Sequence, residues 1–194
     1  MNQGAAYGIL FMKLREAGMK KDYFKPTWMI ERIYQLTPDQ LAKHNIKGVI
    51  TDLDNTLIAW NNPDGTPELR AWLKTMKDAG IPVVILSNNH QGRVKRVADQ
   101  LGVLFTSDAK KPSRRGFKRA IDMLGVSQDE VVIVGDQLLT DVFGGNRLGI
   151  RSILVMPLVE TDLVWTLLNR KIEKFLFKRI EKKHPDLKWR NNIV

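Results

Sequence analysis

Two features are missing from this sequence of 194 residues. It contains no cysteine, which excludes disulfide bonds, thiolate metal sites and cysteine nucleophiles, and which fits a reducing compartment such as the cytoplasm. It also contains no apolar run that approaches the ~18 residues needed by a membrane-spanning helix. With 43% hydrophobic and 27% charged residues, the chain has the composition of one sizeable globular domain with terminal extensions.

Acidic residues are too few to balance the basic ones, and the net charge is +10. Residues 1–50 hold 8 Lys and Arg against 4 Asp and Glu, residues 51–160 hold 14 against 13, and residues 161–194 hold 9 against 4. Basic flanks around a nearly neutral centre indicate an anionic partner, such as nucleic acid, an anionic membrane surface or an acidic substrate. A solvated basic surface without such a partner explains the same composition equally well.

Strand and helix patterns alternate through the centre of the chain. Short β-branched runs predict five strands, at residues 47–53, 81–87, 103–107, 130–136 and 151–156. Helical patterns lie between them, at residues 66–80, 91–102, 113–125 and 138–149. Strands this apolar are buried on both faces, so the pattern predicts an α/β fold with a parallel five-stranded sheet and helices on both faces.

Polar and charged residues follow the predicted strands at their carboxyl ends, where ligands bind in open parallel sheets. They are Asp52 and Asp54 after the first strand, Ser87, Asn88 and Asn89 after the second, Lys110 and Lys111 after the third, and Asp136 and Asp141 after the fourth. Because side chains two apart on an extended segment leave on the same side, Asp52 and Asp54 repel each other. Together with Asp136 they form an oxygen-rich site suited to Mg²⁺.

These residues lie in four motifs that resemble those of the haloacid dehalogenase superfamily of phosphohydrolases. The motifs are DLDNT at residues 52–56, LSNN at 86–89, KKP at 110–112 and VGDQLLTD at 134–141. Each motif alone is a weak signal, but all four in order at strand ends are specific. FKPTW, ITDLDNTLIAWN and VGDQLLTDVFGGNRLG also resemble the YqeG-type phosphatases of subfamily IIIA, which are related to phosphatidylglycerophosphate phosphatases.

The resemblance implies a Rossmann-like fold and a Mg²⁺-dependent phosphomonoester hydrolase that works through an aspartyl phosphate. Asp52 is then the nucleophile, and Asp54 is the general acid that protonates the leaving oxygen and the base that activates water. The implied ligands of Mg²⁺ are the Asp52 carboxylate, the Asp54 backbone carbonyl and Asp136.

The resemblance also implies how the phosphate is bound. Ser87 and Asn88 are expected to bind its oxygens, and Lys111 is expected to neutralise charge in the transition state. Lys111 is preferred over Lys110 because the family places its lysine directly before the proline. Asp141 is expected to orient Lys111 or a metal-bound water.

The spacing of the motifs leaves no room for a cap domain. Between Leu57 and Ser87, one helix and one strand leave about nine residues, enough for a hairpin flap. Between Asn89 and Lys111 there is again only one helix and one strand. A site without a cap stays open to a bulky phosphorylated partner such as a protein, a nucleic-acid end or a lipid head group. Closure by oligomerisation around a small metabolite is the alternative.

A basic amphipathic helix is predicted within residues 161–183. Its apolar stripe consists of Val164, Leu168, Ile172, Phe175 or Leu176, and Ile180, and its basic residues are Arg170, Lys171, Lys174, Lys178, Lys182 and Lys183. Such a helix either packs on its own domain or on a partner subunit, or lies on an anionic membrane surface.

The sequence therefore predicts an N-terminal extension with a helical lead-in at residues 1–40, a haloacid dehalogenase catalytic domain at 41–160, and the basic helix and tail at 161–194. The expected enzyme is a cytoplasmic phosphatase, peripheral at the inner membrane face, that dephosphorylates phosphatidylglycerophosphate. The alternatives are a soluble phosphatase of small metabolites and a nucleic-acid-binding module with vestigial catalysis. The acidic set disfavours the last, because anion binding does not need three aspartates.

Overall fold

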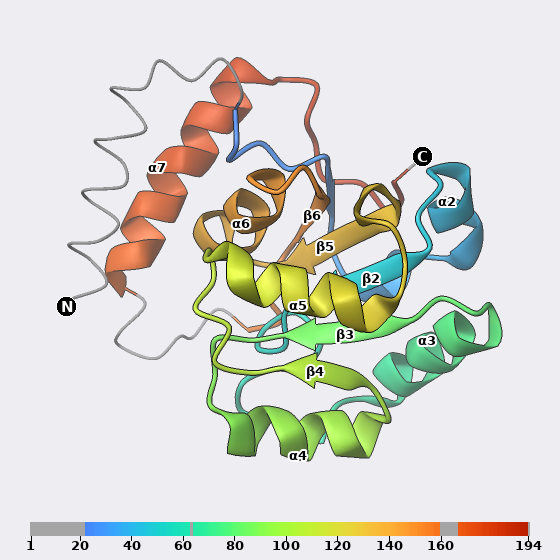
Figure 1. Ribbon diagram of the computed structural model, residues 1–194. Coiled ribbons are helices and arrows are strands. Elements are labelled where there is room, and N and C mark those ends of the chain that lie inside the picture. The colour runs from blue at the N-terminus through green and yellow to red at the C-terminus, as the bar shows by residue number, and fades with distance from the viewer. Residues whose placement is uncertain (1–21, 63, 160–166, 194) are drawn as a thin grey trace.

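The computed structural model describes residues 22–62, 64–159 and 167–193, with the backbone alone for 167–171 (Figure 1). At its centre is a six-stranded sheet with the order β1-β6-β5-β2-β3-β4, and every neighbouring pair is parallel. The strands are β1 (Trp28–Ile30), β2 (Gly48–Thr51), β3 (Val83–Leu86), β4 (Leu104–Thr106), β5 (Val131–Gly135) and β6 (Arg151–Val155). The α/β fold with a parallel sheet is confirmed.

Helices cover both faces of this sheet. They are α2 (Pro38–Lys43), α3 (Pro67–Asp78), α4 (Gln91–Leu101), α5 (Arg114–Leu124), α6 (Phe143–Asn146) and α7 (Leu167–Lys183), with short turns η1 (Ile33–Gln35), η2 (Gln128–Glu130) and η3 (Leu138–Val142). Side chains alternate along β5, so that Val132 and Val134 pack with α3 and α4, whereas Ile133 packs with α5 on the other face. The helix predicted at residues 66–80 begins as expected, since the Thr66 side chain accepts a hydrogen bond from Leu69 N–H at 3.3 Å just before α3.

The sheet has one strand more than the sequence predicts. Strand β1 is only three residues long and follows Pro26, so it carries too little pattern to be recognised. It pairs with β6, Trp28 opposite Ile153, and buries Ile30 completely. Arg190 near the C-terminus donates its N–H to Met29 O at 3.0 Å, so segments from the two ends of the chain lie side by side.

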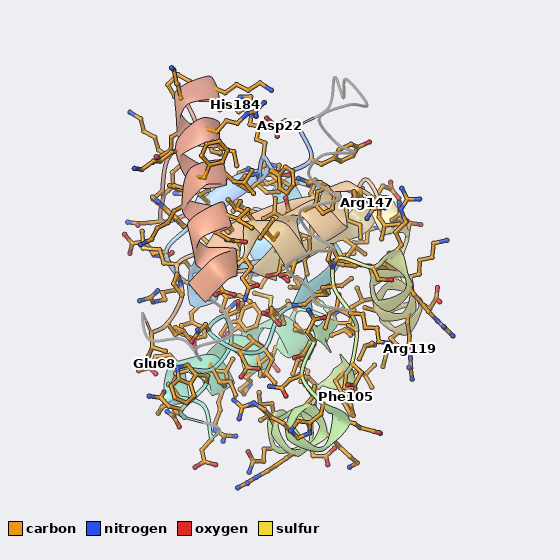
Figure 2. All side chains as sticks on the ribbon, turned by 90° about the vertical axis from the view of Figure 1, so that its left-hand side faces the viewer. Asp22, Glu68, Phe105, Arg119, Arg147 and His184 are labelled. Atoms are coloured by element: carbon orange, nitrogen blue, oxygen red, sulfur yellow. The ribbon has the colours of Figure 1, made fainter. Side chains whose placement is uncertain are left out.

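Helix α7 packs on the domain next to α6 and η3 (Figure 1). Leu176 and Ile180 are both 3% exposed and lie in a cluster with Met29 and Leu154. The end of the helix is tied to Asp22, whose Oδ2 lies 3.0 Å from Lys183 Nζ. Figure 2 shows Asp22 beside His184 at that end of the helix. The apolar stripe of the described part of α7 is therefore covered by protein, while Phe175 remains 58% exposed.

Several residues of the predicted amphipathic helix lie outside the described residues. They are Val164 and the side chains of Leu168, Arg170 and Lys171. Within the described ranges, each helix is too short or too polar to cross a membrane. Residues 52–62 and 64–66 between β2 and α3 form turns rather than an inserted domain, as expected for a chain without a cap.

Candidate active site

The carboxyl ends of β2, β3 and β5 bring three of the motifs together. Strand β2 lies between the other two, Asp52 follows it directly, Ser87 follows β3 and Asp136 follows β5. The strand-end residues predicted from sequence are thus neighbours across the sheet edge, because all its strands run in the same direction.

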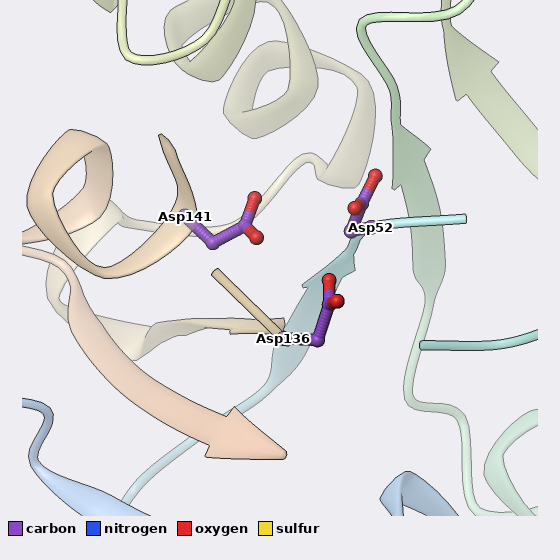
Figure 3. Close-up of side chains that lie close together, drawn as sticks. All are labelled: Asp52, Asp136 and Asp141. Atoms are coloured by element: carbon purple, nitrogen blue, oxygen red, sulfur yellow. The ribbon is translucent and has the colours of Figure 1, made fainter. Parts of the chain in front are cut away.

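Three carboxylates form a compact cluster at this edge. Asp52, Asp136 and Asp141 each place an oxygen within 4.8 Å of the others (Figure 3). Gly135 makes this approach feasible, since a Cβ atom there would lie 2.3 Å from the Asp141 carboxylate. The Oδ1 atom of Asp136 is buried and has no hydrogen-bond partner among the described residues. A buried, unpaired carboxylate oxygen beside two more carboxylates is the donor set that a hard divalent cation requires.

Lys111 is the buried counter-ion of two of these acids. Its Nζ lies 2.7 Å from Asp52 Oδ1 and 2.7 Å from Asp141 Oδ1, and its side chain is 2% exposed. Asn88 holds the backbone on both sides, accepting from Lys111 N–H at 2.5 Å and donating to Lys111 O at 3.3 Å. The Asn88 side chain therefore positions Lys111, a role that the motif alone does not reveal.

Burial dominates the electrostatics of the cluster. It raises the pKa of Asp52 to about 7, with Asp141 and Asp54 adding to the rise and Lys111 opposing it. Burial and then the Asp52 charge raise the pKa of Asp136 well above its usual value. Burial alone would lower the pKa of Lys111, but Asp141 and Asp52 together raise it. The acids are thus poised to bind either protons or a metal cation, and Lys111 stays charged.

The Asp54 carboxylate is not a member of the three-carboxylate cluster and is paired with Arg93 instead. Its Oδ1 accepts hydrogen bonds from Arg93 Nη2 at 2.6 Å and from Arg93 Nε at 3.2 Å. Its Oδ2 accepts one from Asn89 Nδ2 at 3.2 Å. Arg93 Nη2 also donates to the Trp60 carbonyl at 3.0 Å, which ties the turn after β2 to the same guanidinium. Sequence reasoning missed Arg93, although it lies in the first turn of the helix that follows the LSNN motif.

Five of the predicted site residues line one open cavity of about 510 Å³. They are Asp52, Asp54, Ser87, Asn88 and Lys111, and the rest of the wall includes Asn55, Trp60, Asn89, His90, Arg93, Gln137 and Thr140. Ser87 is 2% exposed, and its Oγ accepts the backbone N–H of Asn89 at 3.0 Å. A hydroxyl that accepts in this way keeps its own proton to donate to a ligand oxygen.

Helix α7 supports the loop that carries two of the acids. The Glu173 carboxylate accepts hydrogen bonds from the N–H groups of Leu138 and Leu139, which lie between Asp136 and Asp141. The sequence contains no local signal for this contact, because the partners are 34 and 35 residues apart.

Comparisons with known proteins show the family to which the chain belongs. Residues 63–149 match the haloacid dehalogenase-like hydrolase family. The chain is 42% identical to the probable phosphatase YqeG of Bacillus subtilis (strain 168), over 85% of this chain and 96% of that protein. It is 25% identical to phosphatidylglycerophosphate phosphatase 1, chloroplastic/mitochondrial, of Arabidopsis thaliana, over 82% of this chain but only 49% of that protein.

Among solved structures, a putative haloacid dehalogenase superfamily (subfamily III A) hydrolase from Legionella pneumophila is 24% identical. The match covers 51% of this chain and 60% of that one, with a TM-score of 0.39. Identity of 42% across nearly all of the Bacillus relative is the stronger result. On that ground, the chain belongs to the haloacid dehalogenase-like hydrolases and is one of their phosphatases.

Proposed function

We propose that this phosphatase hydrolyses phosphomonoesters through an aspartyl phosphate on Asp52, with Mg²⁺ as its cofactor. The observation that carries the proposal is the position of Asp52. It follows β2, lines the open cavity, lies 2.7 Å from the buried Lys111 Nζ, and has an oxygen within 4.8 Å of oxygens of Asp136 and Asp141. A carboxylate placed in this way faces both an incoming phosphate and the charges needed to accommodate it.

The cluster fits a bound Mg²⁺ ion. Asp52 and Asp136 would supply carboxylate oxygens, including the unpaired Oδ1 of Asp136, and the Asp54 backbone carbonyl would supply a third ligand. When bound, Mg²⁺ offsets the repulsion between a carboxylate nucleophile and an anionic phosphate. Asp141 would stay with Lys111, to which it is already paired at 2.7 Å.

The residues of the chain would then divide the reaction into two steps. In the first, an Asp52 oxygen forms a bond to phosphorus, the ester P–O bond breaks, and Asp54, once it has left its ion pair with Arg93 and taken up a proton, gives that proton to the leaving oxygen. In the second, Asp54 takes a proton from water, the water oxygen attacks phosphorus, and the P–O bond to Asp52 breaks. Free phosphate leaves, and both aspartates return to their starting states.

Three groups would bind the phosphoryl oxygens during both steps. Ser87 has a hydroxyl proton to donate, and the Asn88 backbone N–H follows it at the end of β3. Lys111 contributes a fixed positive charge, because its two carboxylate partners keep it protonated and in place. Such preorganised donors stabilise the charge that develops on the equatorial oxygens in the transition state.

The substrate that we infer is a phospholipid, phosphatidylglycerophosphate, whose head group carries the phosphomonoester. Support comes from the absence of a cap in residues 52–62 and 64–66 and from the relative named for this activity. The exposed face of α7 would bring the enzyme to the inner face of an anionic membrane, through Lys174, Lys178 and Lys182 around the exposed Phe175. The membrane contact is then mainly electrostatic, because Leu176 and Ile180, in the described part of the apolar stripe of α7, already pack on the protein.

The test is Mg²⁺-dependent phosphate release from phosphatidylglycerophosphate in mixed micelles, compared with a panel of soluble phosphomonoesters. Asp52→Asn protein serves as the blank. We expect turnover of the lipid that is lost in the variant and in EDTA. Turnover confined to soluble phosphates would identify a metabolite phosphatase and overturn the lipid assignment. Salt-sensitive nucleic-acid binding without any turnover would overturn the enzymatic one.

A further inference from the structure

The cavity contains a second cation for which the proposed chemistry has no use. Among its described lining residues, the Lys and Arg side chains are Lys111 and Arg93. Lys111 lies at the bottom, 2% exposed and paired with two acids. Arg93 reaches the same cavity from α4, and its side chain is 24% exposed. The cavity therefore has one cationic side chain where the phosphate to be cleaved would bind and a second one nearer to the solvent, and each is paired with an aspartate.

The guanidinium of Arg93 is held rigidly but is not saturated. Its hydrogen bonds to Asp54 Oδ1 and to the Trp60 carbonyl use Nε and Nη2. Within the described residues these are its polar contacts, so the two N–H groups of Nη1 remain for a ligand. An arginine that is already fixed loses little further side-chain entropy when it binds an anion, and its planar fork matches a phosphate.

The position of Arg93 relates the anion that it would bind to the phosphate that would be cleaved at Asp52. Asp54, which it contacts at 2.6 Å, is two residues from Asp52. Arg93, Asp54 and Asp52 all line the same cavity. An anionic group bound by Arg93 would therefore belong to the same substrate molecule as a phosphate bound at Asp52.

We propose that Arg93 recognises a second anionic group of the substrate, so that the enzyme selects phosphomonoesters with a phosphodiester or another phosphate nearby. This rests on the proposed function and narrows its substrate class. The shared chemistry is a second phosphate-type anion, which a lipid head group or a soluble bisphosphate supplies. Asn89 already holds the other oxygen of Asp54 at 3.2 Å, so Arg93 is not needed solely to orient that carboxylate.

Ligand affinity tests this independently of turnover. Calorimetry in Mg²⁺ on Asp52→Asn protein would compare glycerol 3-phosphate with the deacylated head group, glycerophosphoglycerol phosphate. Both carry the same glycerol monoester, but only the second has a phosphodiester. We expect the head group to bind at least about tenfold more tightly than glycerol 3-phosphate, because one charge-assisted hydrogen bond contributes about that much affinity. Adding Arg93→Gln should remove that gain, whereas adding Arg96→Gln, on the exposed face of α4, should keep it.

Equal affinities for the two ligands, or a gain that survives Arg93→Gln, would overturn the proposal. Fructose 1,6-bisphosphate and fructose 6-phosphate form a second pair. An Arg93-dependent gain in that pair assigns the site to soluble bisphosphates, and a gain confined to the head group assigns it to the lipid. Failure of the proposed function would be seen separately, as wild-type protein that releases phosphate from neither glycerol ester.

Discussion

The Glu173 carboxylate accepts a hydrogen bond of 2.7 Å from the backbone N–H of Leu139. It also accepts a hydrogen bond of 3.1 Å from the neighbouring N–H of Leu138, so helix α7 anchors the first turn of η3. That turn begins just after Asp136 and carries Asp141, two members of the carboxylate cluster. Helix α7 is thus part of the framework of the site, although it lies far from the four motifs in sequence.

Substitution of Glu173 by alanine should therefore weaken both the fold and metal binding. The N–H groups of Leu138 and Leu139 belong to residues that are 2% and 6% exposed, and they would lose their partner. We expect a loss of about 1–3 kcal/mol in the free energy of unfolding, measured with urea. Mg²⁺ affinity should fall as well, because the loop between Asp136 and Asp141 loosens.

The matched control is Glu181→Ala, an exposed glutamate two turns further along the same helix. It should leave both quantities within experimental error of wild type. If Glu173→Ala and Glu181→Ala behaved alike, the hydrogen bonds to η3 would have no role in supporting the site.

Substituting Lys111 by methionine should destabilise the protein, because the lysine offsets the repulsion between Asp52 and Asp141. Without Nζ, Asp52 and Asp141 lose a partner at 2.7 Å inside the protein. Removing one member of a buried ion pair typically costs about 3–5 kcal/mol. We expect a loss of that size in EDTA, a smaller loss in Mg²⁺, and no phosphatase activity in either.

Thermal unfolding with and without Mg²⁺ measures this, with Lys110→Met as the control because Lys110 is exposed. A Lys110 variant as unstable as the Lys111 variant would show that the ion pairs are not the cause. The comparison would also test the choice of Lys111 over its neighbour, which the sequence makes only by resemblance.

The strand-end residues were predictable because parallel strands bring their carboxyl ends together whatever the rest of the fold does. From the sequence alone, that rule puts Asp52, Ser87 and Asp136 at one edge of the sheet, where the structure has them. It does not cover the contacts that a side chain makes with a different helix, strand or turn. Arg93 reaches Asp54 across 39 residues, and Glu173 reaches η3 across 34, so neither contact leaves a local pattern.

Strand β1 and helix α7, near the two ends of the chain, also have features that sequence patterns alone do not predict. Strand β1 has three residues and, unlike the equally short β4, does not lie between two predicted helices that would mark it as a strand. The apolar stripe of α7 has the period of a helix, and that period is identical for a helix on a membrane and for one on its own domain. Only the packing of Leu176 and Ile180 against Met29 and Leu154 distinguishes the two for the described part of the helix.

The stability of the metal-free protein should fall as the pH rises. Burial raises the folded-state pKa of Asp52 from 3.8 to about 7 and that of Asp136 well above 3.8. Acids that hold protons more tightly when folded stabilise the protein below their unfolded pKa, and this stability is lost as the pH rises through the folded pKa. Bound Mg²⁺ favours the ionised carboxylates, so its stabilising effect should grow over the same range.

Melting temperatures in EDTA and in Mg²⁺, from about pH 5.5 to about pH 8, would check the sign. The shift caused by Mg²⁺ should be small at the acidic end and largest at the alkaline end. In Asp136→Asn protein the pH dependence should flatten, because one of the two raised groups is gone. A Mg²⁺ shift that is independent of pH would contradict the assignment of these acids as ligands.

Binding to anionic vesicles should depend on the exposed face of α7. Reversing Lys174, Lys178 and Lys182 to glutamate replaces three positive charges on that face with three negative ones and leaves the buried Leu176 and Ile180 in place. At about 1 kcal/mol for each lysine, vesicle affinity should fall by at least about a hundredfold. Truncation before α7 would be a poorer test, because it also removes packing side chains from the domain.

Cosedimentation with vesicles of anionic lipid measures this, and the control is the matched triple reversal of Arg115, Lys118 and Arg119 on α5. That control changes the net charge equally, so an effect of charge alone would appear in both variants. We expect only the α7 variant to lose binding and, with it, turnover of lipid rather than of the soluble head group. Wild-type protein that stays in the supernatant would rule out the membrane contact while leaving the chemistry at Asp52 untouched.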